Sequence, residues 1–234
     1  MALELREVTK YQRAAGTMTR ALDEVNLRCA AGTWTVITGP PGSGKSTLVR
    51  CAGGLETVSA GEVVVGGVGT RGSGNVRGGR VGVLSRRPRL VEHLTVEENV
   101  ALPLRMEGRR KSERIIRALL DCVGLLAHRH LLPAQISASE RQCVAVVRAL
   151  ASRPDVLVAD EPTAGMERAA AEVVLELFRD WVDSTGLSIV MAANDFTSLT
   201  CADAVVFLCD GRIVDRNEVP QDQPVAPRTT WNEV

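Results

Sequence analysis

Apolar and polar positions alternate in short runs along the first part of the chain, the pattern of half-buried β-strands. The clearest runs are residues 3–8 and 25–29, with breaks at Gly16 and Gly32. A more continuous apolar run, residues 33–37, leads directly into a glycine-rich segment. The pattern predicts short strands here, the last of them running into a loop.

The later part of the chain alternates between helical and buried-strand patterns. Residues 111–126 place apolar side chains at helical spacing among charged ones, which predicts an amphipathic helix ending at Gly124 or just beyond. Further helices are expected at 139–151 and 167–184. Apolar runs at 155–161, 188–192 and 204–208 predict strands buried on both faces. This alternation predicts an α/β fold with a parallel sheet.

Two segments are expected to be irregular. Residues 61–82 are rich in glycine between strand patterns at 62–65 and 81–84, which favours a mobile loop and allows local disorder at 69–79. The tail at 217–234 carries prolines and many polar residues, so we expect it to be flexible.

Length and charge narrow the possible partners. A chain of 234 residues can bury one sizeable α/β core with a smaller lobe. Its 28 basic and 28 acidic residues balance, so no overall field favours nucleic acid or an anionic membrane surface. We therefore expect no nucleic-acid partner, and any other partner must be indicated by local features of the sequence.

The positions of the histidines and cysteines in the sequence do not predict a metal site or a disulfide. His128 and His130 flank Arg129 with no cysteine or carboxylate close by in the sequence, so we interpret them as a solvated helix end, without a metal site built from protein ligands alone. The six cysteines lack C-x-x-C spacing and suit small buried residues in a reducing cytosol. They are Cys29, Cys51, Cys122, Cys143, Cys201 and Cys209.

Membrane insertion is not expected. No run reaches the roughly 18 apolar residues of a membrane helix. Charges at Glu4, Arg6 and Glu7 stand where a secretory segment would be apolar. We expect a cytosolic chain, or one held at the membrane by a partner.

One segment carries a specific chemical signal, because residues 39–47 fit the pattern G-x-x-x-x-G-K-[ST] between a predicted strand and a helix. Glycines let backbone N–H groups surround phosphates, Lys45 reaches the outer phosphates, and Ser46 can ligate Mg²⁺. A chance glycine turn is the alternative, and the surrounding strand and helix disfavour it. The predicted binding residues are Gly39, Pro40, Pro41, Gly42, Ser43, Gly44, Lys45, Ser46 and Thr47.

Two carboxylates end a predicted buried strand farther along the chain. In a parallel sheet, Asp160 would lie beside the phosphate-binding loop, where its carboxylate can hold Mg²⁺ through water. Glu161 can accept a proton from an attacking water, which is the general-base task in nucleotide hydrolysis. The alternative is a solvated acidic start of a loop.

In this order, the motifs of residues 2–215 resemble the nucleotide-binding subunits of ATP-binding cassette (ABC) transporters. The resemblance rests on Tyr11, GPPGSGKST (39–47), LTVEENVALPL (94–104), VLVADEPT (156–163), IVMAAND (189–195) and DGRIV (210–214). It implies a P-loop NTPase core of the RecA type within residues 1–216. An N-terminal antiparallel β subdomain and a helical subdomain at about 86–136 would be attached to that core.

The resemblance also implies roles and partners. Tyr11 would stack on the adenine of ATP, unless it is simply a strand aromatic, while Ser46 and Asp160 would handle Mg²⁺. Such subunits work as homodimers or heterodimers, and their helical subdomain receives a membrane permease at the inner face of the cell membrane. The segment 98–104 is similar to the subgroup that serves lipoprotein release, cell division and macrolide export.

Four positions depart from the family pattern. Arg86 aligns with the usual glutamine, Asn194 with the switch histidine, and Glu167 with a final aspartate. In the signature, which would face the partner's ATP, both glycines are replaced, and a Cβ there would obstruct approach to the γ-phosphate. That segment reads Ile136, Ser137, Ala138, Ser139 and Glu140.

These departures lead us to expect weak hydrolysis. Asn194 can donate a hydrogen bond to a phosphate oxygen but carries no charge. Repulsion between Arg86 and Mg²⁺ leads us to expect that Arg86 contacts the γ-phosphate or turns toward a partner. With Glu161 as base, the prediction is an ABC-type ATPase subunit with impaired turnover.

The alternative is a binding module that closes on ATP without hydrolysing it. A DNA-repair ABC protein or a P-loop kinase fits the length and motifs less well.

Overall fold

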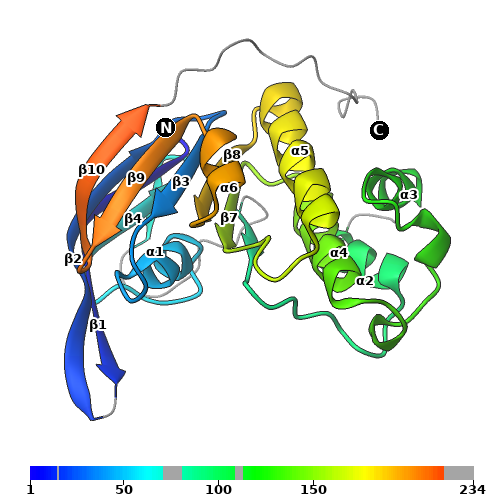
Figure 1. The fold of residues 1–234 in the computed structure, drawn as a ribbon, viewed down its shortest axis with the longest axis horizontal. Coiled ribbons are helices and arrows are strands. Elements are labelled where there is room, and N and C mark those ends of the chain that lie inside the picture. Colours follow the sequence, from blue (N-terminus) through cyan, green and yellow to red (C-terminus); the bar gives the residue numbers. More distant parts are fainter. Residues whose placement is uncertain (15, 71–80, 109–112, 219–234) are drawn as a thin grey trace.

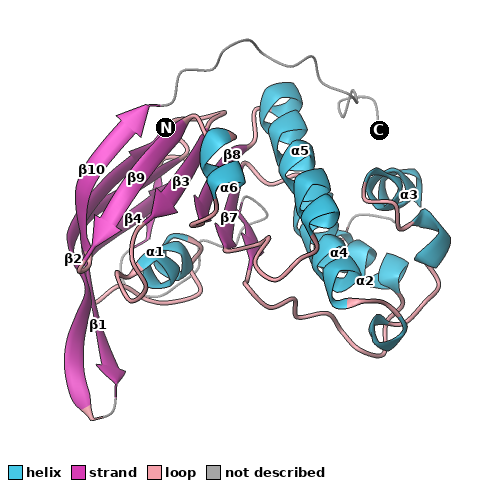
Figure 2. Cartoon of the chain, viewed as in Figure 1, coloured by secondary structure: helices cyan, strands magenta, loops and turns pink. Residues whose placement is uncertain are grey.

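The computed structural model describes residues 1–14, 16–70, 81–108 and 113–218. Two sheets and a set of helices form the fold, and Figure 1 shows the sheets on one side of the molecule and most of the helices on the other. Strands, helices and loops are distinguished in Figure 2. The arrangement is a mixed α/β fold, as the alternating sequence patterns predict.

The antiparallel sheet is built mainly from the N-terminal part of the chain. Its order is β2-β1-β4-β5. The bounds are Leu3–Ala14 for β1, Thr17–Cys29 for β2, Ala60–Val65 for β4 and Val68–Thr70 for β5. Strands β1 and β2 form a long hairpin with shifts in register. This sheet is the antiparallel β subdomain that the family resemblance implies.

The second sheet has the order β10-β9-β3-β8-β7-β6, in which β9, β3, β8, β7 and β6 run parallel and β10 is antiparallel to β9. The bounds are Trp34–Thr38 for β3, Val81–Leu84 for β6, Val156–Asp160 for β7, Ser188–Ala192 for β8, Ala204–Cys209 for β9 and Arg212–Glu218 for β10. Because parallel strands end at one edge, residues after β3, β6, β7 and β8 gather there.

The helices are α1 (Lys45–Ala52), α2 (Val96–Met106), α3 (Glu113–Cys122), α4 (Ala138–Ala151), α5 (Arg168–Thr185) and α6 (Phe196–Thr200). Two short 3₁₀ turns, Leu126–His128 and Pro133–Gln135, precede α4. Among the described helices, none has both the length and the apolar content needed to cross a membrane.

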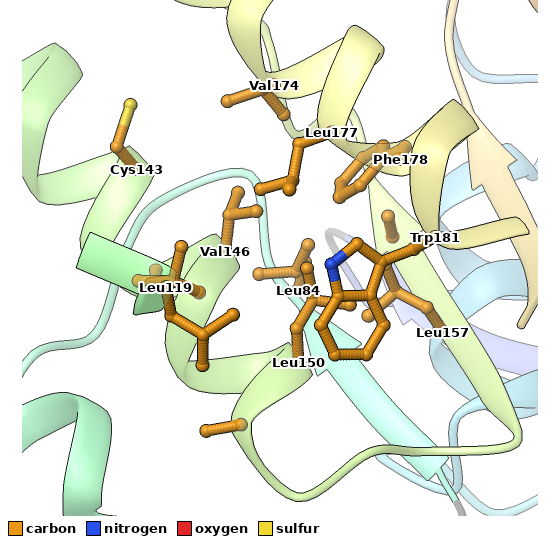
Figure 3. Packing of buried hydrophobic residues seen from close by; sticks show 14 of the residues in the cluster. Leu84, Leu119, Cys143, Val146, Leu150, Leu157, Val174, Leu177, Phe178 and Trp181 are labelled. Carbon is orange, nitrogen blue, oxygen red and sulfur yellow. The ribbon is translucent and has the colours of Figure 1, made fainter. Parts of the chain in front are cut away.

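Two cores explain why the central strands read as unbroken apolar runs. In β7, Leu157 and Ala159 face the core under α4 and α5, whereas Val156 and Val158 face the core around α1 and the antiparallel sheet. Figure 3 shows Leu157 in the same cluster as Phe178 and Trp181 of α5. Burial on both faces removes the polar alternation that a half-exposed strand would show.

Several predicted boundaries need correction. The predicted helix 111–126 is too long, because α3 ends at Cys122 and a separate 3₁₀ turn follows Gly124. Strands β1 and β2 extend well beyond the predicted 3–8 and 25–29 because their hairpin pairs as far as Ala14 and Thr17. Most of the predicted irregular loop and tail, residues 71–80 and 219–234, lies outside the described residues, although β10 reaches Glu218.

Candidate nucleotide-binding site

The predicted phosphate-binding loop joins β3 to α1, at the carboxyl edge of the parallel sheet. Three of its glycines have positive φ values, 147° for Gly39, 80° for Gly42 and 103° for Gly44. A Cβ on Gly39 would collide with the backbone oxygen of Leu208, and one on Gly44 with that of Ala21. Both neighbours are backbone atoms that cannot rotate away. The loop path therefore requires glycine at these two positions.

Polar groups of the loop are directed toward one another. Lys45 is buried, and its Nζ donates to the carbonyl oxygens of Gly39 at 2.6 Å and Pro40 at 2.9 Å. The Oγ of Ser43 is buried and has no hydrogen-bond partner among the described residues. The ammonium group of Lys45 and the hydroxyl of Ser43 are both donors that can bind phosphate oxygens.

The start of α1 contacts the end of β7. Ser46 Oγ donates to Asp160 Oδ1 at 2.7 Å, and Arg50 Nη1 lies 3.6 Å from Asp160 Oδ2. Ser46 and Arg50 are four residues apart on α1, so they share a helix face. A hydroxyl beside a buried carboxylate is an oxygen donor set that suits Mg²⁺. The residues present therefore fit a magnesium-bound triphosphate.

Glu161 lies directly after Asp160 in a constrained backbone. Its φ is 45°, and its N–H donates to the carbonyl oxygen of Ala192 at 2.9 Å. Arg86, which follows β6, brings its Nε to 3.3 Å from Glu161 Oε2. The sequence did not suggest this ion pair. The predicted contact of Arg86 with a γ-phosphate concerns a nucleotide-bound state and stays a prediction.

Asn194 follows β8 at the same edge of the sheet. In the amide orientation that satisfies its neighbours, its nitrogen donates to Gly39 O at 3.0 Å, Ala193 O at 3.2 Å and Thr38 Oγ1 at 3.2 Å. Asn194 and Glu161 also line a common cleft of about 340 Å³. The structure thus brings together the phosphate loop, Asp160, Glu161, Asn194 and Arg86.

Tyr11 lies on the hairpin of the antiparallel sheet, and 45% of its surface is exposed. Arg20 is its cross-strand partner in β2, with the guanidinium carbon 5.8 Å from the ring centroid. The next residue, Gln12, donates to Thr47 Oγ1 in α1 at 3.2 Å. The hairpin that carries Tyr11 is therefore linked to the end of the phosphate-binding loop through Gln12, whereas Tyr11, the preceding residue of the strand, points to the other face of the hairpin.

Residues 136–140, where the sequence predicts an altered signature, include the N-cap and the first turn of α4. Ser137 is the N-cap, and a reciprocal capping box joins it to Glu140, whose Oε2 accepts from Ser137 N at 2.7 Å. Glu140 Oε1 lies 2.9 Å from His128 Nδ1. The hydrogen bonds from the backbone and side chain of Ser137, together with His128, lower the pKa of Glu140. A carboxylate of this chain thus occupies the start of α4.

Two of the altered positions contact each other. Ser139 Oγ accepts a hydrogen bond from the backbone N–H of Glu167 at 3.2 Å. Glu167 is the N-cap position of α5, and its own side chain makes no capping hydrogen bond. Ser139 and Glu167 therefore belong to one local arrangement at the starts of α4 and α5.

The structure adds site residues that the motifs did not single out, namely Gln12, Arg20 and Arg50. The signal for Arg50 is its i, i+4 spacing from Ser46. Arg20 gave no signal before its pairing with Tyr11 was known. Both predicted solvated histidines turn out to have a carboxylate close by, since His130 Nδ1 lies 3.7 Å from Glu97 and His128 approaches Glu140.

The cysteines are all free thiols. Cys29, Cys51 and Cys143 are buried, which agrees with the prediction for these three, while the others are partly exposed. Burial raises the pKa of each of these buried thiols to about 11. Buried thiols with raised pKa values stay protonated near neutral pH and do not act as nucleophiles.

Comparison with known proteins identifies the family. Residues 22–164, more than half of the chain, match the family described as "ABC transporter". The chain belongs to the ABC transporter family. It is 38% identical over 215 residues to the methionine import ATP-binding protein MetN of Mesorhizobium japonicum, and 37% identical over 223 residues to that of Rhizobium johnstonii. These alignments cover 89% and 92% of the chain.

Solved structures of ABC cassettes share the fold. The cassette MJ0796, described as a dimer in a post-hydrolysis state bound to ADP and Pi, superposes with a TM-score of 0.85 and 26% identity. The superposition covers 94% of this chain and 99% of that one. The RecA-type core with its antiparallel and helical subdomains is therefore the fold of this ABC family member.

The relatives correct the predicted subgroup. They are methionine import proteins, so the assignment of residues 98–104 to the lipoprotein-release, cell-division and macrolide-export subgroup is wrong. A seven-residue segment of the helical lobe carried too little information to separate subgroups of one family. The ABC chain spans 59% and 61% of the length of the first two relatives.

Proposed function

We propose that this ABC family member binds Mg-ATP between the phosphate loop and the end of β7, and couples its binding and slow hydrolysis to a membrane permease. The observation that carries the proposal is the 2.7 Å contact between Ser46 and Asp160, which are 114 residues apart in sequence. Chance glycine turns do not bring a lysine, a hydroxyl and a buried carboxylate into one place.

Each group has a task in this proposal. Lys45 would exchange its contacts with the loop carbonyls for phosphate oxygens, and Ser46 and Asp160 would hold Mg²⁺. Mg²⁺ supplies neutralisation of phosphate charge when it is bound. Tyr11 would stack on adenine. Glu161 would orient water and accept its proton, as a carboxylate at this edge of the sheet can.

Slow turnover follows from the altered positions. The amide nitrogen of Asn194 donates to the carbonyl oxygen of Gly39. Because an amide is neutral, Asn194 lacks the charge and the proton-transfer ability of histidine. Glu140 places a negative group at the start of α4, where a partner's γ-phosphate would otherwise meet free backbone N–H groups. Asn194 and the carboxylate of Glu140 would both weaken stabilisation of the charge that develops on the transferred phosphoryl group.

For partners, we propose a membrane permease and a second cassette, either another copy of this chain or a different ABC subunit. The relatives named as methionine import proteins favour an import system over export. In this proposal residues 1–216 form the cassette, and the helical subdomain at about 86–136 contacts the permease. The chain is then peripheral at the inner face of the cell membrane, without insertion of its own.

A second candidate function is a module that closes on ATP and regulates a permease without turnover. The closed capping box of Ser137 and Glu140 favours it, because the signature turn is already satisfied by its own residues. The two functions share the nucleotide site and differ in whether Glu161 acts as a base.

Titration of the full chain with Mg-ATP tests the shared site. Wild type is expected to bind, while Lys45→Ala and omission of Mg²⁺ should each weaken binding by more than about tenfold, since each removes a charge-assisted contact to phosphate. Arg28→Ala is the matched control, because it also removes a positive charge but lies on the outer strand β2. This variant should bind Mg-ATP as tightly as wild type does. Equal binding by wild type and Lys45→Ala would contradict the proposed site.

A further inference from the structure

Arg86 and Glu161 meet because of strand register. Strands β6 and β7 are parallel neighbours, with Leu84 opposite Ala159. Arg86 and Glu161 each lie two residues beyond this pair, at the edge where the phosphate loop also lies. The 3.3 Å separation of Arg86 Nε and Glu161 Oε2 therefore follows from the architecture of the sheet.

The two partners differ in freedom. Glu161 has a positive φ and a backbone hydrogen bond to Ala192, and its side chain is 20% exposed. Arg86 lies on the loop after β6, and its side chain is 65% exposed. An ion pair with an exposed partner is weak, so the guanidinium can leave while the carboxylate stays in place.

An oxygen held by a guanidinium is not free to accept a proton from water. Asp160 is adjacent to Glu161 in sequence and lies 3.6 Å from Arg50. Arg86 shares a pocket with Asp160, and the other charged residues that line it are Arg50, Arg87 and Arg89. A triphosphate bound at the nucleotide site would bring more negative charge than Glu161 carries, and would attract the mobile guanidinium more strongly. A diphosphate lacks the terminal group and would leave the pair intact.

From this geometry we propose that Arg86 is a positioning residue that masks the general base: it pairs with Glu161 and leaves it when the terminal phosphate of ATP binds. The inference rests on the proposed nucleotide site and adds a regulation of that site. Oε2 of Glu161 becomes available to water only when a triphosphate is present. No other nucleotide state would release it.

Four proteins test this inference by binding alone: wild type, Arg86→Gln, Glu161→Gln and the double variant. The probes are the non-hydrolysable Mg-AMP-PNP and Mg-ADP. If Arg86 leaves Glu161 for the terminal phosphate, Glu161→Gln should tighten AMP-PNP binding in both backgrounds. The gain in affinity should be about two- to fivefold larger in the wild-type background than in the Arg86→Gln background, because only wild type must break the ion pair. Affinity for ADP should show no such coupling between the two positions.

A permanent structural pair gives the opposite sign. If Arg86 stayed on Glu161 when nucleotide is bound, the carboxylate would already be neutralised, and Glu161→Gln would tighten AMP-PNP binding more in the Arg86→Gln background. That result, or equal effects in both backgrounds, would overturn the inference. Arg114→Gln, an exposed arginine of α3, is the matched control and should not alter AMP-PNP affinity. If no variant bound either nucleotide, the proposed function itself would fail.

Discussion

Single residues decide the shape of the phosphate loop. Gly39, Gly42 and Gly44 all have positive φ values, yet they differ in what surrounds them. Gly39 and Gly44 face backbone oxygens, whereas a Cβ on Gly42 would meet no atom within 4 Å. The first and third positions are thus fixed by close backbone approach, and the second by conformation alone.

This difference predicts unequal alanine substitutions. Gly42→Ala should cost about 1–2 kcal/mol from the left-handed conformation. Gly39→Ala should cost more, because its Cβ also collides with the Leu208 carbonyl oxygen and forces the loop or β9 to move. Urea denaturation of both variants measures the difference. Equal losses would show that the contact with Leu208 does not constrain the loop.

The sequence predicted that Lys45, Ser46 and Asp160 would lie together, but not all of their contacts. These residues were predictable because their residue types and order follow from phosphate and metal chemistry. The Arg86–Glu161 ion pair was not, since it depends on the register of β6 against β7. A pattern along one chain does not contain that register.

Among the elements, the start of α4 is determined by its capping box. Ser137 Oγ accepts from Glu140 N at 3.2 Å, and the carboxylate of Glu140 accepts in return from Ser137 N. Helix α2 begins in the same way, with Thr95 and Glu98. Both helix starts satisfy backbone donors that would otherwise be left without partners.

Removing either cap should destabilise the fold by a similar amount. Ser137→Ala and Thr95→Ala are each expected to lower the free energy of unfolding by about 1 kcal/mol, because each loses one N-cap hydrogen bond. Denaturant midpoints with unchanged slopes would check this. If Ser137→Ala were neutral while Thr95→Ala was destabilising, the signature turn would not depend on its own cap.

Element prediction succeeded where periodicity is strong. Helices α4 and α5 and the strands β7, β8 and β9 were placed within about two residues, since long amphipathic stripes and doubly buried strands leave clear patterns. Helix α2 was not predicted as a separate element, and it contains Pro103, which argues against a helix locally. Helix α6 has only five residues, too few for a periodic signal.

On the scale of the whole molecule, the site depends on both cores. The core beneath α5 includes Trp34 and Phe178, whose rings pack edge to face with centroids 5.8 Å apart. The second core holds α1 against β7 and the antiparallel sheet. The carboxyl edge of the parallel sheet lies between these cores. Packing on both faces of the sheet therefore holds Ser46, Asp160 and Glu161 in fixed positions.

We propose that the altered positions limit ATP turnover at this site, and steady-state turnover measurements decide whether they do. Wild type should turn over slowly, and the variant Ala138→Gly/Ser139→Gly/Asn194→His should be at least about tenfold faster, since it restores phosphate approach and a proton-transferring side chain. Glu161→Gln in each background should abolish turnover. Equal rates for wild type and the restored variant, with both correctly folded, would contradict the account.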